Sequence, residues 1–458
     1  MKEKKLFDAL TNIPDELVEE ARKTKLKPTV RPWKKWTALA ACVALAIVMV
    51  SILPRGGSPS EGALLDVVLP KAYAYDDFGA KQAAIDVNPV DDAFLKALDE
   101  FSYKTASQIV AGQSGNTNYS PLSLYYALAM AASGAEGETA DELLSLLGVS
   151  DPSTLSKQSG NLYRQLYTDN AIAKLKIANS LWMNKKVSWK NKFIKNAAAN
   201  FYTSSFSMDF SDKKTGEEMA KWVSEHTDGI LKPEIEITQD QILSILNTVY
   251  FYDEWVNKFK EAETTEDAFY LSDGSTEHSN FMNAKYASAD FAKGEGFTRS
   301  ALSLKNDSRM VFILPDEGVS PQELLSSPEK AKAAFEGGQD GHGEVVWQIP
   351  KFRFGTKLDL KDALIRLGLT SAFEQNADFS GITDKRASLT GVRQETHIGI
   401  DENGVEASAF TEILYAGGAA PLSKDRAEMV LNRPFIYGIT APNGALLFIG
   451  ICENPLEK

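Results

Sequence analysis

The sequence predicts a large α+β domain, and three observations lead to that fold class. Within the patterned part of the chain, which begins near Asp91, helix signals come early and strand signals come late. Helical and extended segments do not alternate regularly, so a parallel sheet built from βαβ units is not indicated. The pattern also has no fixed internal repeat and no long low-complexity segment.

Two early segments carry the clearest helix signals. Residues 121–134 (PLSLYYALAMAASG) begin at a proline, end at a glycine and are apolar on nearly every side, which predicts a buried helix. Residues 139–147 (TADELLSLL) are amphipathic, with Thr139 as the expected N-cap and Glu142 three residues later. That spacing is typical of a capping box.

The later strands are recognised by their composition. Residues 242–252 (ILSILNTVYFY) are rich in β-branched and aromatic residues, which predicts a buried strand. Residues 310–314 and 345–349 have the same character. Residues 435–440 and 446–451 flank an Ala-Pro-Asn-Gly turn and predict a hairpin.

Bulk composition limits the kinds of partner. The chain has 458 residues and a formal net charge of −13. The first 36 residues contain ten Lys or Arg and six Asp or Glu, a net of +4, which leaves −17 for the remainder. An acidic body disfavours binding to nucleic acid. The two cysteines, Cys42 and Cys452, do not suggest a structural disulfide.

Residues 37–53 (TALAACVALAIVMVSIL) are 17 residues without a charge. Lys and Arg crowd the N-terminal side of this run, whereas Arg55 stands alone on the other side. The positive-inside rule then predicts a single-pass cell-membrane protein with its N-terminus in the cytoplasm and its large domain outside. The alternatives are a cleaved signal peptide, which would give a secreted protein, and a lipoprotein box at residues 39–42.

This anchor divides the chain into four predicted parts. Residues 1–36 form a cytoplasmic tail, residues 37–53 the transmembrane anchor, residues 54–90 a linker of mixed composition, and residues 91–458 the folded domain.

Catalytic and metal motifs are not found. The histidines do not sit at ligand spacing on a helix, and GxSxG, P-loop and GxGxxG patterns are lacking. Cys452 lies in an apolar strand and is expected to be buried rather than nucleophilic. We therefore expect a protein that is not an enzyme and that has no metal or cofactor.

One stretch near the C-terminus is unusual. In residues 405–415 the odd positions are uncharged, whereas the even positions include Glu406, Ser408 and Glu412. This alternation predicts a strand with one buried face. The same stretch runs directly into Gly-Gly-Ala-Ala-Pro, a composition typical of exposed loops.

Several strings, in order along the chain, resemble the landmarks of the serpin family over about residues 91–458. The strings are NTNYSPLS at 116–123, IANSLW at 177–182, LNTVYF at 246–251 with Trp255 and Phe259, PKF at 350–352, DLKDAL at 359–364, ADFSG at 377–381, NRPF at 432–435 and FIG at 448–450. The resemblance implies the serpin fold, which has helices, three β-sheets and an exposed reactive-centre loop. It also implies a suicide inhibitor of serine proteases, in which the cut loop inserts as a new strand of a central sheet.

By this resemblance the unusual stretch contains the hinge and the bait. The hinge residues are Glu402, Gly404, Val405, Glu406, Ala407, Ser408 and Ala409. Phe410 departs from the small residue that the family prefers, and its parity places it on the outward face. The family spacing from Gly404 gives Gly418–Ala419 as the reactive-site bond, with Ala416, Leu422, Ser423 and Lys424 as alternative bait positions. The small residues of this region suit an elastase- or subtilisin-like protease, whereas Lys424 would suit a trypsin-like one.

Two control regions carry over as well. Asn116, Ser120, Ser123 and Asn247 match the family's shutter, a polar cluster beneath the point where the sheet opens, with Gln394 where a histidine is frequent. Trp255 matches the breach, the end of the sheet where insertion begins.

The expected partner is a target serine protease, with a cysteine protease as the alternative, and the chain is expected to be a monomer. Membrane contact is expected through residues 37–53. Neither nucleic acid nor heparin is expected to bind, because the body is acidic and residues 155–176 show no basic helix face. A non-inhibitory serpin that acts as a surface binding or signalling module is the alternative function.

Overall fold

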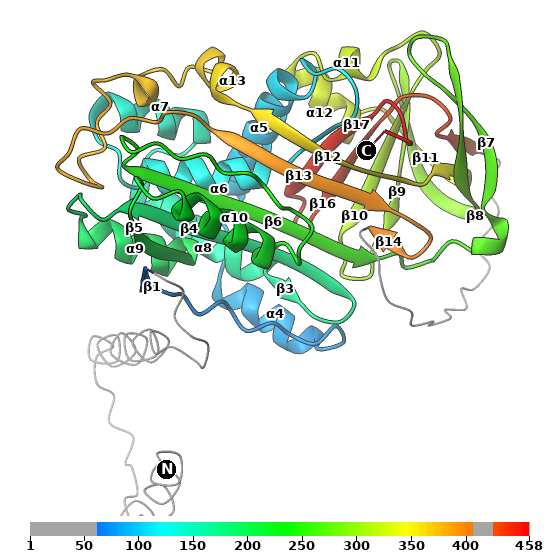
Figure 1. Ribbon diagram of the computed structural model, residues 1–458. Helices are drawn as coiled ribbons and strands as arrows, with labels where there is room; N and C mark the ends of the chain where they lie inside the picture. The colour runs from blue at the N-terminus through cyan, green and yellow to red at the C-terminus, as the bar shows by residue number, and fades with distance from the viewer. Residues whose placement is uncertain (1–61, 406–424, 458) are drawn as a thin grey trace, which may run out of the picture. The chain divides into compact units, whose positions relative to one another are not determined.

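Figure 1 shows the computed structural model of the chain. The structure describes residues 62–405 and 425–457. The chain divides into two units, Met1–Arg55 and Gly56–Lys458, and every described residue belongs to the second unit.

The described residues form two sheets, and the first of them has eight strands. Its strands follow the order β1-β5-β4-β6-β14-β13-β12, and β3 pairs with β4. Their bounds are Ala63–Leu65 (β1), Thr203–Met208 (β5), Ala173–Asn184 (β4), Leu243–Glu254 (β6), Gly404–Val405 (β14), Arg393–Ile400 (β13), Phe352–Asp359 (β12) and Thr168–Asp169 (β3). The strand β14 is thus a two-residue insert between two long strands (Figure 1).

The second sheet has the order β15-β11-β8-β9-β10-β16-β17-β2, and β7 pairs with β8. Its strands are Arg426–Val430 (β15), Gln339–Pro350 (β11), Thr276–Gly294 (β8), Phe297–Ser303 (β9), Arg309–Pro315 (β10), Phe435–Thr440 (β16), Leu446–Cys452 (β17), Thr117–Tyr119 (β2) and Thr265–Tyr270 (β7). The 19-residue β8 and the 12-residue β11 run the length of this network. The predicted fold has three sheets, whereas the strands of this second sheet, β8 and β11 among them, form one continuous hydrogen-bonded network.

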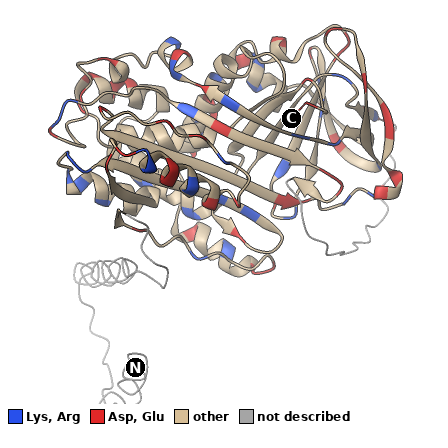
Figure 2. Cartoon of the chain, in the orientation of Figure 1, with Lys and Arg blue, Asp and Glu red and all other residues tan. Residues whose placement is uncertain are grey.

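The helices surround both sheets. They are Phe78–Val87 (α4), Asp92–Ile109 (α5), Pro121–Ala132 (α6), Gly137–Leu147 (α7), Pro152–Leu166 (α8), Asn191–Phe201 (α9), Lys214–His226 (α10), Pro321–Leu324 (α11), Pro328–Glu336 (α12) and Lys361–Arg366 (α13), with 3-10 turns at Glu261–Glu263 (η2) and Ser371–Phe373 (η3). The helix α6 contacts both β6 and β17, which explains why it is apolar on nearly every side. Basic and acidic residues are interspersed over the described elements (Figure 2).

The α+β fold class is confirmed, and so are the main elements. The predicted buried helix is α6, the strand at residues 242–252 is β6, and the predicted hairpin is β16–β17. The capping box is wrong: α7 starts at Gly137, so Thr139 lies inside the helix. Its Oγ1 accepts a hydrogen bond from the Asp378 N–H, and Glu142 accepts hydrogen bonds from Thr370 and Ser371.

Part of the segment predicted as a linker is folded against the domain. The strand β1 pairs with β5, and α4 contacts α8. At the end of α4, the carbonyl oxygens of Asn88 and Pro89 accept hydrogen bonds from Gln165 and Asn161 at 2.8 and 2.6 Å. These contacts attach residues 62–90 to the sheet and to α8, while the four predicted domain boundaries stay a prediction.

The predicted single-pass membrane location is corrected by the helices of the described part. Over residues 62–405 and 425–457, no helix combines the length and the apolar character that a membrane crossing needs. A spanning helix takes about 20 apolar residues, whereas α6 has 12 and the 18-residue α5 carries charges such as Lys96 and Asp99. Residues 37–53, the predicted anchor, lie outside the described residues. A membrane-spanning location is therefore not supported, and membrane contact is withdrawn as a partner interaction.

Candidate functional site: a central slot in the first sheet

The centre of the first sheet is a slot between β6 and β13. The two strands are joined through β14, where Gly404 pairs with Glu254 and Val405 pairs with both Asp253 and Ile400. Beyond Val405, no ladder pair joins β6 directly to β13 in the described part of the chain. The two long strands diverge from β14 in the view of Figure 1.

A small cavity of about 20 Å³ continues the slot beyond Val405. Its inner wall includes Phe251 of β6 and Ile398 of β13, and its outer wall is formed by Thr227, Ile230 and Leu231, which follow α10. A cavity of this size holds about one water molecule or one methyl group. The slot therefore has room for the first small side chain after Val405.

Three buried polar atoms on β6 lack hydrogen-bond partners among the described residues: Asn247 Oδ1, Thr248 Oγ1 and the Tyr252 hydroxyl. Buried polar atoms are nearly always hydrogen-bonded in folded proteins. These residues do not line the cavity, and the Asn247 side chain extends toward Asn179 on β4.

Backbone contacts fix the entry of the hinge. The Trp255 N–H donates to Asn403 O at 3.0 Å, and the Phe259 N–H donates to Glu402 O at 3.0 Å. A Cβ atom on Gly404 would lie 2.2 Å from Asp253 O. Only glycine fits this approach, which explains the glycine of the hinge motif.

The Glu402 side chain anchors the hinge through charge. Its carboxylate lies 2.9 Å from Lys351 Nζ and accepts a hydrogen bond from Thr264 Oγ1 at 2.8 Å, and the side chain is only 8% exposed. Burial opposes ionisation, but the hydrogen bonds from Lys351 and Thr264 outweigh it and lower the pKa of Glu402. Lys351 is a partner that the sequence analysis missed, and no local signal pairs it with Glu402.

We expect the stability that Glu402 contributes to depend on pH. Because folding lowers the pKa of this carboxyl, its contribution is complete above the ordinary pKa of a glutamate and is lost as the pH falls through the lower pKa of the folded state. Urea unfolding of the wild type and of Glu402→Gln should therefore differ at neutral pH, and the difference should shrink in acid. A difference in unfolding free energy that stays constant from neutral to acid pH would contradict this assignment.

Trp255 lies at the breach, where the hinge enters the sheet. It is 1% exposed, its Nε1–H donates to Asp401 O at 2.8 Å, and its ring packs edge-on against Phe259. The structure thus places Trp255 against the segment predicted as the hinge, while its role as the breach stays a prediction.

Two acidic residues beside Trp255 were missed. Burial strongly raises the pKa of Asp253, whose carboxyl accepts from the Asn306 N–H, and Glu254 lies 2.8 Å from Lys305 Nζ. The sequence signal available for them is an acidic pair at the end of an apolar strand.

The predicted shutter residues only partly come together. Gln394 Oε1 accepts from the Ser120 N–H at 2.8 Å, and Gln394 Nε2 donates to Ser120 O at 2.9 Å. Ser120 Oγ donates to Leu447 O and accepts from the Ser123 N–H. Gln394 therefore holds both backbone groups of Ser120, so a polar link connects β13 to the start of α6.

Two of the predicted shutter residues have other partners. Asn247 Nδ2 donates to Asn179 Oδ1 on β4 at 2.6 Å. Asn116, which was predicted to belong to the same polar cluster, does not join it. Its side chain binds the backbone of Glu453 and Asn454, not Ser120 or Gln394. The extended β2 separates Asn116 from Ser120 by about 13 Å of chain.

The bait itself falls outside the described residues. This holds for Gly418 and Ala419, for the alternatives Ala416, Leu422, Ser423 and Lys424, and for the hinge residues Glu406, Ala407, Ser408 and Ala409. Both anchors are described: Val405 ends in the first sheet, whereas Arg426 starts β15 and pairs in parallel with Glu344 of β11 in the second sheet. Residues 406–424 therefore connect two different sheets.

A Ser–His–Asp arrangement lies elsewhere on the surface. His342 Nε2 is 2.7 Å from Ser288 Oγ, and His342 Nδ1 is 2.6 Å from Asp290 Oδ1. The side chains of His342 and Asp290 are 58% and 77% exposed, and none of the three residues lines the slot cavity. Among the described residues, His342 and Asp290 are exposed to solvent and lack the enclosed, water-excluding surroundings that catalysis by such groups uses.

Comparisons with known proteins show what the chain is similar to. The family model described as Serpin (serine protease inhibitor) matches residues 96–455. The protein "Serpin-ZX" of Arabidopsis thaliana is 28% identical over 385 residues, which cover 79% of this chain and 98% of that protein.

Solved structures give the same result for the fold. The native state of the thermophilic serpin tengpin superposes with a TM-score of 0.71 at 26% identity, covering 84% of this chain and 97% of that one. A complex of thyroxine-binding globulin with thyroxine has a TM-score of 0.67 at 23% identity, covering 78% and 99%. The second likeness concerns the fold alone.

Proposed function

Because the chain belongs to the serpin family, whose members are generally protease inhibitors rather than enzymes, we propose that it traps serine proteases covalently by inserting its cleaved loop into the slot between β6 and β13. The protease cuts the loop and forms an acyl-enzyme with it. Insertion then drags the protease away before water can release it. The inhibitor supplies the bait and the conformational change, and the protease supplies the catalysis.

The observation that carries this proposal is the position of Val405. It already pairs with β6 on one side and β13 on the other. Continuing that register in the inserted state sets Ala407 opposite Phe251 and Ile398, Ala409 opposite Val249 and Thr396, and Thr411 opposite Asn247 and Gln394. The uncharged side chains of the loop then face the core, and Ala407 enters the small cavity.

The length of the slot supports the same reading. In this register the first residue of β6, Leu243, lies opposite Tyr415, where the regular alternation of the loop also ends. Each new ladder hydrogen bond contributes about 0.5–1.5 kcal/mol, and the apolar burial adds to it. Insertion of residues 406–415 is therefore strongly favourable once the loop is cut.

The bait is assigned from the hinge spacing. We propose Gly418–Ala419 as the reactive-site bond, with Ala416 and Leu422 as alternatives for an elastase- or subtilisin-like protease. Counting back from Pro434 and Phe435 gives Ser423–Lys424 as the alternative bond. A trypsin-like enzyme would instead use Lys424 as its bait, because such enzymes cut after a basic residue.

Incubation with pancreatic elastase, subtilisin and trypsin tests the proposal. The expected result is a complex with one protease that survives SDS, together with a released C-terminal peptide whose first residue, found by mass spectrometry, identifies the bond. Cleavage of the loop by all three proteases without any such complex would contradict inhibition. That outcome would favour a non-inhibitory member that acts as a binding module.

A further inference from the structure

The end of α10 covers the slot at the level that the loop must reach first. Thr227, Ile230 and Leu231 form the outer wall of the cavity next to Val405. Leu231 also packs with Trp222 and Val223 in an apolar cluster on the face of β4 and β5. We name residues 227–231 the cover.

The inserted loop needs the space beneath this cover. If insertion proceeds in the register of Val405, Ser408 lies opposite Tyr250 and His397, which both line the cavity, and its side chain points outward. Phe410 follows on the same face, opposite Thr248 and Glu395. A cavity of about 20 Å³ holds about one methyl group, so the backbone and the outward side chain of an inserting strand do not fit at the level of Ser408 unless the cover shifts.

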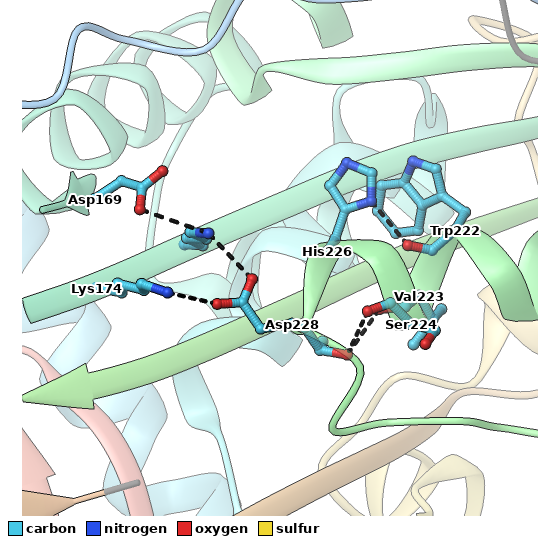
Figure 3. Close-up of polar contacts among 9 residues, drawn as sticks. Asp169, Lys174, Trp222, Val223, Ser224, His226 and Asp228 are labelled. Atoms are coloured by element: carbon cyan, nitrogen blue, oxygen red, sulfur yellow. Dashed lines mark hydrogen bonds and ion pairs between the residues drawn. The ribbon is translucent and has the colours of Figure 1, made fainter. Parts of the chain in front are cut away.

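Charge holds the cover to β4. Asp228 adopts a left-handed backbone conformation, with φ 49°, and its carboxylate lies 2.7 Å from Lys174 Nζ and 3.2 Å from Lys176 Nζ (Figure 3). Lys176 also lies 3.5 Å from Asp169 Oδ1 (Figure 3). Burial opposes ionisation of Asp228, but the hydrogen bonds from the two lysines outweigh it and lower the pKa of its carboxyl.

Hydrogen bonds join the residues of the cover to one another and to the end of α10, and so connect Asp228 to the residues that line the cavity. Thr227 Oγ1 donates to Val223 O at 2.8 Å and accepts from the Leu231 N–H at 3.2 Å. Just before the cover, His226 Nδ1 lies 2.8 Å from Trp222 O and its ring stacks on Trp222 (Figure 3). These contacts tie the cover to the last turn of α10.

We propose that Lys174, Asp228 and Lys176 form an electrostatic latch that keeps the cover over the slot and sets the rate of loop insertion. The three side chains are 31%, 32% and 22% exposed, so water and salt reach them and the contacts open readily. The latch rests on the proposed function, because it acts on the insertion step. Its role is to keep the cover closed in the uncut protein while allowing it to open under the driving force of a cut loop.

The test measures insertion directly in the full chain. A dye attached at Glu412→Cys, an outward-facing position of the loop beyond the cover, in a Cys42→Ser background reports when the loop enters the sheet, because the remaining Cys452 is fully buried. After the loop is cut, Asp228→Asn is expected to insert about threefold to tenfold faster than the wild type, the effect of losing one or two partly exposed ion pairs. Asparagine tolerates the left-handed conformation, so this change removes the charge and keeps the backbone.

A matched control comes from a second cluster of the same kind. Asp209 lies 3.1 Å from Lys185 Nζ and 3.5 Å from Lys186 Nζ, and it is 29% exposed, but it lies outside the cover. Asp209→Asn should leave the insertion rate unchanged. High salt should accelerate loop insertion in the wild type and leave the insertion rate of Asp228→Asn unchanged. The response of the wild type to salt tests the latch even if a variant fails to fold.

The results of this experiment distinguish a failure of the proposed latch from a failure of the proposed inhibitory function. Equal insertion rates for the wild type and Asp228→Asn, or equal acceleration by Asp209→Asn, would overturn the latch and leave inhibition standing. Failure of the cut wild-type loop to enter the sheet would overturn both proposals.

Discussion

Replacing Ala407 by glutamate is expected to convert the protein from an inhibitor into a substrate of its target protease. In the inserted state residue 407 faces the cavity between Phe251 and Ile398, whose described lining contains no Lys or Arg. An unpaired carboxylate buried there costs about 3 kcal/mol or more. Insertion then slows by about a hundredfold or more, and water releases the protease first.

The experiment counts inhibitor molecules consumed per protease trapped, using whichever protease forms the stable complex with the wild type. Ser408→Glu is the matched control, because the side chain at this neighbouring position points outward, toward the cover that shifts during insertion, and not into the core. Ala407→Glu should be cut at the normal rate but form little complex, whereas Ser408→Glu should still form it. Equal loss of complex in both variants would contradict the register from Val405, and no loss in Ala407→Glu would contradict insertion itself.

Replacing Trp255 by alanine is expected to reduce the free energy of unfolding by about 3–5 kcal/mol, the usual cost of removing a fully buried large aromatic side chain. Trp255 is 1% exposed, contacts Phe259 and donates from Nε1 to Asp401 O. The variant leaves a cavity under the hinge and an unpaired carbonyl at Asp401. The hinge and the end of β6 are therefore expected to loosen together.

Urea unfolding of the wild type, Trp255→Ala and Trp255→Phe checks this prediction. Phenylalanine retains much of the ring contact but lacks the N–H donor, so it should cost less, with about 1 kcal/mol coming from the lost hydrogen bond. Hydrogen exchange at Asn403 and Val405 should rise in Trp255→Ala. An alanine variant as stable as the wild type, with unchanged exchange at the hinge, would show that Trp255 does not hold the breach.

Much of the fold was accessible from the sequence because its signals are local. The apolar helix α6, the β-branched strand β6 and the β16–β17 hairpin each follow from periodicity, composition or turn residues within one segment. The capping box at Thr139 and Glu142 failed for the opposite reason. The side chains are those of a cap, but tertiary contacts engage them elsewhere: Thr139 binds Asp378, and Glu142 binds Thr370 and Ser371.

The residues of the candidate site also differ in how far local sequence predicts their contacts. Gly404 and Trp255 were predicted from their motifs as hinge and breach, and these roles stay predictions. The structure shows only their local contacts: there is no room for a Cβ at Gly404, and the Trp255 indole donates to Asp401 O. Asn116 was grouped with Ser120 by its place in a motif, but β2 carries it to the C-terminal segment near Glu453. Proximity in sequence does not fix proximity in space when an extended strand intervenes.

By itself the sequence determined which face of residues 405–415 avoids charge, because alternation along a strand is written in the order of the residues. Only the tertiary structure decided what that face meets. It set Val405 between Asp253 and Ile400, gave Glu402 its partner Lys351, and put the residues that follow α10 beside the cavity next to Val405. These are pairings between segments far apart in the chain, and they arise from long-range packing, which no local pattern encodes.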